Sequence, residues 1–128
     1  MATAPKIPAP IHDVENVLAF RTHVGGVTID AGKTEDLGLV DVSRFDRIRL
    51  VADERIGSSC NVLVRLTITE GKELVAFLDQ VTLTPHSQAT RVYDVPGTHL
   101  TVSIEGMPAF PPRPNAKGTV DVLIYGQY

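Results

Sequence analysis

The stretch of this sequence that most constrains the fold is segment 61–70, Asn-Val-Leu-Val-Arg-Leu-Thr-Ile-Thr-Glu. Its apolar residues Val62, Val64, Leu66 and Ile68 recur at every second position. This period places them on one face of a β-strand, whereas a helix would scatter them around its circumference. The β-branched Val, Ile and Thr residues also favour a pleated surface. The segment therefore predicts a strand that buries one face.

The same pattern recurs along most of the chain and predicts an all-β protein. We expect about eight or nine strands, at a spacing typical of an antiparallel two-sheet β-sandwich. A jelly-roll-like arrangement is favoured over an immunoglobulin-like one, because the chain has no tryptophan for the immunoglobulin core. Besides 61–70, the predicted strands are 14–24, 27–29, 37–39, 45–52, 73–83, 89–95, 99–105 and 118–125.

Three local features of this sandwich are also predicted. The turn signal Glu-Gly-Lys at 70–72 joins 61–70 and 73–83 into a hairpin, and irregular apolar phase in 73–83 indicates a bulge. Pro96-Gly97 is typical of a type II turn, so 99–105 should double back. A polar turn is expected over 30–36, and Phe20, Phe45 and Phe77 are expected in the core.

Length and composition predict one domain, residues 14–128, behind a proline-rich arm, residues 1–13. The 12 basic and 15 acidic residues give a net charge of -3 without a long run of one sign, which argues against nucleic-acid and membrane partners. No apolar stretch has the length of a signal peptide or a membrane span, so we expect a soluble, by default cytoplasmic protein. Cys60 is the one cysteine, so no intramolecular disulfide can form.

Two features indicate contacts with another protein. The loop 107–117 holds four prolines around Phe110 and Arg113, and a stiff loop loses little entropy on binding. The chain ends with Tyr125 and Tyr128, and tyrosine is enriched at interfaces. The favoured interpretation is a non-enzymatic structural or protein-interaction subunit that forms a homo-oligomer or binds a protein partner.

Catalytic and metal-binding patterns are weak. The carboxylates Asp30, Glu35 and Asp36 are calcium candidates, but turn capping and solvation explain them better, as they do the later cluster that includes Glu54. The His-x-His pair of metal-binding cupins is absent, as are the Gly-x-Ser-x-Gly elbow and any glycine-rich phosphate loop. We therefore predict no catalytic residues and no cofactor, and calcium at those three carboxylates is the less favoured alternative.

The strand pattern over residues 14–126 resembles the jelly-roll sandwiches that serve as ancillary ligand- or carbohydrate-binding modules. The resemblance implies a second interpretation, in which the chain binds a carbohydrate and Tyr93, Phe110 and the two terminal tyrosines make the contacts. The chain departs from that group in having no tryptophan, which sugar-binding platforms often use.

Overall fold

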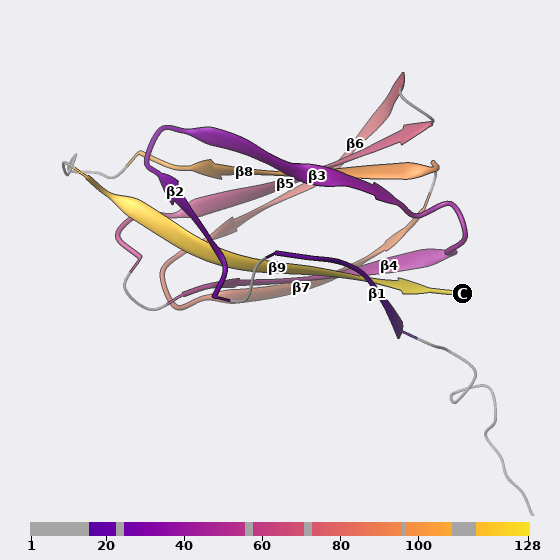
Figure 1. Ribbon diagram of the computed structural model, residues 1–128, viewed down its shortest axis with the longest axis horizontal. Helices are drawn as coiled ribbons and strands as arrows, with labels where there is room; N and C mark the ends of the chain where they lie inside the picture. Colours follow the sequence, from indigo (N-terminus) through magenta and orange to yellow (C-terminus); the bar gives the residue numbers. More distant parts are fainter. Residues whose placement is uncertain (1–15, 23–24, 56–57, 71–72, 96, 109–114) are drawn as a thin grey trace, which may run out of the picture.

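The computed structural model describes residues 16–22, 25–55, 58–70, 73–95, 97–108 and 115–128, and its regular structure is entirely β (Figure 1). These residues contain no helix, and so none that is long and apolar enough to cross a membrane. The predicted all-β class and strand number are confirmed. The nine strands are β1 (Asn16–Arg21), β2 (Val27–Asp30), β3 (Thr34–Asp41), β4 (Arg47–Glu54), β5 (Val62–Glu70), β6 (Glu73–Leu83), β7 (Gln88–Asp94), β8 (His99–Gly106) and β9 (Lys117–Gln127).

The strands form two antiparallel sheets that lie one above the other (Figure 1). The first sheet has the order β1-β9-β4-β7, with β2 also paired to β9, and the second sheet has the order β3-β8-β5-β6. Early strands thus pair with late ones in a nested series: β1 and β2 with β9, β3 with β8, β4 with β7, and β5 with β6. This is one long hairpin folded into two layers, the arrangement of a jelly roll.

The core lies between the two sheets and follows the period-two pattern of the sequence. Val62, Val64, Leu66 and Ile68 of β5 are all 0% exposed, as the alternation predicts. The first sheet supplies the opposite wall of the core from alternate residues of β4 and β9, namely Ile48, Leu50, Ala52, Val120, Val122 and Ile124.

One of the three phenylalanines expected in the core lies on the surface instead. Phe45 is buried and the half-buried Phe20 packs against the core, but Phe77 is 56% exposed. The predicted hairpin and its irregularity are confirmed, because β5 pairs with β6 through two register shifts. These shifts set Phe77 opposite Thr67, on the outer face of the second sheet.

The segment 99–105 does not form a hairpin with the strand before it. β7 belongs to the first sheet and β8 to the second, where β8 pairs with β3 and β5. The chain therefore crosses between layers near Gly97, and Pro96 lies outside the described residues. A Cβ atom on Gly97 would lie 2.6 Å from the Thr69 carbonyl oxygen. This glycine allows two backbone segments to approach closely.

Register shifts also shape two edge strands. The pairing of β1 with β9 shifts between Leu18 and Phe20, and Leu18 is 49% exposed. β3 starts at Thr34, so the polar turn expected over 30–36 is shorter than predicted, and its pairing with β8 shifts at Gly38. Both edges therefore turn one large apolar side chain outward, Leu18 on β1 and Leu39 on β3.

Candidate functional site

The outer face of the first sheet carries a row of side chains across four strands. The register sets Leu18 of β1 opposite Tyr125 of β9, Tyr125 opposite Arg49 of β4, and Arg49 opposite Val92 of β7. Residues that lie opposite one another share a face, and the alternate positions of β4 and β9 are buried. Leu18 and Val92 are each 49% exposed. The row presents an apolar side chain at each edge, with a tyrosine and an arginine between them.

Two further rows flank this central row and complete a surface that we call the Tyr125 face. The first of these rows has apolar residues on its two central strands. In the second row the polar side chains contact one another: the Gln127 side-chain amide donates a 2.7 Å hydrogen bond to Asn16 Oδ1, and Arg47 lies 3.8 Å from Asp94. The flanking rows are Arg21, Leu123, Val51 and Thr90, and Asn16, Gln127, Arg47 and Asp94.

The Tyr125 face contains a small hollow beside an arginine without a partner. A pocket of about 260 Å³ is lined by Asn16, Arg49, Val51 and Tyr125. The Nε atom of Arg49 is buried and has no hydrogen-bond partner, and Arg49 forms no ion pair within the described part of the chain. Buried polar groups in proteins are normally satisfied. Arg49 therefore brings to this pocket a positive charge that no acidic side chain of the described residues pairs with.

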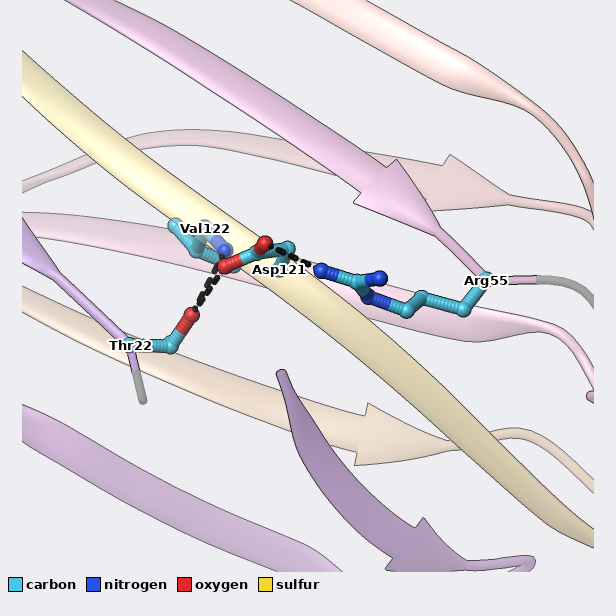
Figure 2. Close-up of polar contacts among 4 residues, drawn as sticks. All are labelled: Thr22, Arg55, Asp121 and Val122. Atoms are coloured by element: carbon cyan, nitrogen blue, oxygen red, sulfur yellow. Dashed lines mark hydrogen bonds and ion pairs between the residues drawn. The ribbon is translucent and has the colours of Figure 1, made fainter. Parts of the chain in front are cut away.

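A polar cluster holds the edge strand β1 in place beside this face (Figure 2). The Thr22 hydroxyl donates a 2.7 Å hydrogen bond to Asp121 Oδ1 and accepts one of 3.1 Å from the Val122 amide. The Thr22 amide donates to the Val122 carbonyl at 3.1 Å. The second oxygen of Asp121 lies 2.8 Å from Arg55 Nη2. Thr22 thus ties the end of β1 to β9, next to the residues of the central row.

We expect Thr22→Val to lower the free energy of unfolding by about 1–2 kcal/mol, because it leaves the buried Asp121 oxygen and Val122 amide without a partner. Urea unfolding measures this change. Thr28→Val is the matched control, because the Thr28 hydroxyl makes an exposed hydrogen bond of 2.8 Å with the Thr119 hydroxyl. Equal losses in the two variants would contradict the structural role of Thr22.

Glu54 is a carboxylate buried at the end of the core. It is 1% exposed, and neither of its oxygens has a hydrogen-bond partner among the residues that the structure describes. A Cβ atom on Gly118 would meet the Val62 side chain and would lie 3.1 Å from Glu54 Oε1, so a larger residue there would crowd both side chains. The sequence interpretation of Glu54 as a solvated turn residue is wrong. The burial of Glu54 agrees with the alternation along β4, because Glu54 follows Ile48, Leu50 and Ala52 at the same inward-facing spacing.

The surroundings of Glu54 favour its neutral form. Burial raises the pKa of Glu54 to about 7. The Ser58 hydroxyl and the Val62 amide lie near enough to lower that pKa in part, but without the geometry of hydrogen bonds. Burial, together with Glu54, also raises the pKa of the Cys60 thiol, which disfavours the reactive thiolate.

Two tyrosines proposed as contacts lie away from the Tyr125 face. Tyr128 is 54% exposed, and its ring centroid is 5.5 Å from that of the buried Phe45. The Tyr93 hydroxyl donates a 2.6 Å hydrogen bond to Asp79 Oδ2 and so links β7 of one sheet to β6 of the other. Tyr125 is the predicted contact residue that takes part in the central row. Sequence analysis did not single out its neighbours in that row, Leu18, Arg49 and Val92.

Of the remaining predicted site residues, the structure describes the three carboxylates. Phe110 and Arg113 lie outside the described residues. Asp30 pairs with Lys117 at 3.8 Å, whereas Glu35 and Asp36 lie on β3. In the described segments no group of three His, Cys, Asp or Glu side chains is arranged to hold a metal ion.

Comparisons with known proteins identify the fold alone. No family model matches the chain, and no curated protein does. Among solved structures, part of tripeptidyl peptidase 2 matches with a TM-score of 0.62 and 10% identity over 84% of this chain, which spans 10% of the length of that chain. A pilus protein of Bacillus endospore appendages matches at 0.46, with 15% identity over 98% of both chains. A family 4 carbohydrate-binding module, CBM4, matches at 0.44, with 8% identity over 94% of this chain and 83% of that chain.

Proposed function

We propose that the chain is a non-enzymatic structural subunit that assembles with other copies of itself through the Tyr125 face. The observation that carries this proposal is the central row, with apolar side chains on both edge strands and an unpaired arginine beside a tyrosine in the middle. Exposed apolar side chains on a surface that also carries tyrosine and arginine suit an interface, because tyrosine and arginine are among the residues enriched at the energetic centres of interfaces.

The environment of the Tyr125 face also suits a contact surface. Its edge strand β1 is fixed through Thr22, so binding would not have to order it. Its side chains belong to regular strands, which hold a recognition surface more firmly than loops do.

The mass of the protein in solution tests this proposal. Light scattering at a low and a high protein concentration should show mass above that of a monomer at the higher concentration. Val92→Glu should return the protein to a monomer, because it places a charge in a contact that would exclude water. Thr84→Glu, on the exposed connection between β6 and β7, is the control and should assemble as the unaltered chain does. A monomer at both concentrations, or assembly that survives Val92→Glu, would contradict the proposal.

The pocket on the Tyr125 face supports a second candidate function, which is carbohydrate binding. Its 260 Å³ offers a tyrosine ring, the Asn16 amide and a free guanidinium, and the guanidinium favours a sugar that carries a carboxylate. Under this alternative the chain is a monomer that binds an oligogalacturonate and not a neutral glucan in calorimetry. Arg49→Gln should abolish that binding.

A further inference from the structure

The second sheet also presents an outer face with a row of side chains across four strands. The register sets Leu39 of β3 opposite Thr101 of β8, Thr101 opposite Thr67 of β5, and Thr67 opposite Phe77 of β6. Leu39 and Phe77 are each 56% exposed. Like the central row of the Tyr125 face, this row has large apolar side chains on both edge strands and smaller or polar ones between them. We call this surface the Phe77 face.

The dimensions of the two rows match. Each runs across four strands, and strands lie about 4.8 Å apart, so the edge residues of each row are roughly 14 Å apart. When two sheets pack face to face, their strands stay within about 30° of parallel and their side chains interdigitate. A Phe77 face laid on a Tyr125 face could therefore bring both pairs of apolar edge residues together. The two threonines would then lie over Tyr125 and Arg49.

The two faces differ in charge. The three rows of the Tyr125 face hold Arg21, Arg47 and Arg49 against a single acid, Asp94. The next row of the first sheet adds Asp53 and Asp121, but Asp121 is already paired with Arg55.

The same three rows of the Phe77 face hold fewer basic groups than the Tyr125 face and one more acid. Asp36 and Asp41 lie there with Arg65 and His99, and Glu105, in the next row, lies 3.7 Å from Arg65. A Tyr125 face packed on another Tyr125 face would bring arginines together, whereas a Tyr125 face on a Phe77 face pairs basic groups with acidic ones.

We propose that the partner of the Tyr125 face is the Phe77 face of a second copy of this chain, an inference that rests on the proposed function. The two faces point away from each other, one from each layer of the sandwich (Figure 1). A contact between unlike faces leaves one of each kind free at the ends of a dimer. The contact therefore repeats, and copies stack sheet on sheet into an open chain.

A mixing experiment with two variants tests this arrangement. Val92→Glu disables the Tyr125 face, and Phe77→Glu disables the Phe77 face; both residues are about half exposed, so neither change opens the core. Each variant alone should be a monomer at a concentration where the unaltered chain forms larger species. An equimolar mixture should form a dimer and nothing larger, because one intact face of each kind remains. Leu39→Glu should behave as Phe77→Glu does.

Each contrary result has a distinct meaning. If Phe77→Glu assembles like the unaltered chain while Val92→Glu is monomeric, the Tyr125 face binds something other than the Phe77 face. The arrangement would then be overturned while the proposed function stands. If both variants assemble like the unaltered chain, the proposed function fails as well. Added salt should weaken assembly of the unaltered chain, and assembly that salt leaves unchanged would overturn the pairing of opposite charges.

Discussion

Leu66→Ala should lower the free energy of unfolding by about 2–5 kcal/mol, the cost of a cavity left by a large buried side chain. Leu66 is 0% exposed and lies in the middle of β5, a strand with neighbours on both sides. The second sheet is paired there with β6 and β8, so the surrounding backbone has little freedom to fill the space. Urea unfolding at a protein concentration low enough to keep the chain monomeric measures the loss, because self-association adds apparent stability.

Leu39→Ala is the matched control for this substitution. It removes the same atoms from a side chain that is 56% exposed, so we expect a loss below about 1 kcal/mol. A loss from Leu66→Ala as small as that of the control would mean that the register of β5 is wrong by one residue, since such a slip turns every side chain to the other face.

The stability of the protein should fall as the pH rises from about 4.5 to about 7, because of Glu54. The pKa of Glu54 rises from 4.5 to about 7 on folding, and burial is the main cause. A carboxyl with a raised pKa binds its proton more tightly in the folded state, so its contribution is complete below the unfolded pKa and is lost as the pH passes the folded one. A shift of this size corresponds to a loss on the order of 3 kcal/mol. Urea unfolding at pH 5 and at pH 8 measures it.

Glu54→Gln should remove most of this pH dependence, because the amide does not titrate. The variant should be more stable than the unaltered chain at pH 8 and similar to it at pH 5. Glu35→Gln, at an exposed position on β3, is the control and should keep the pH dependence. A pH dependence that persists in Glu54→Gln would place its origin in groups other than Glu54.

The strands could be predicted because their pattern is local, whereas the bulges could not. Val62 to Ile68 alternate within one segment, and that alternation decides which face is buried wherever the strand pairs. The outward position of Phe77 depends on two register shifts in the pairing of β5 with β6. The sequence of β6 indicated an irregularity, but its position is set by the partner strand. The sequence of β6 alone therefore predicts a buried Phe77.

The candidate site could be predicted one residue at a time but not as a surface. Tyr125 was recognised by its type, as an amphipathic side chain near the end of the chain. Its neighbours Leu18, Arg49 and Val92 come from three other strands, and only the pairing of those strands with one another brings the four together. Glu54 differs from these, because its charge predicts exposure whereas its inward phase in β4 predicts burial, and the phase prevails.

The position of β9 in the first sheet has a consequence for how the chain reaches its fold during synthesis. β1, β2 and β4 all pair with β9, and among the described strands β1 pairs with β9 alone. β1, β2 and β4 therefore keep unpaired edges and exposed apolar faces until β9, which is synthesised after them, emerges from the ribosome. Pairing between segments so distant in sequence is slow, and exposed edges in the meantime invite aggregation. Chaperones that shield nascent chains should matter more for the first sheet than for β5 and β6, which can pair as soon as their hairpin is made.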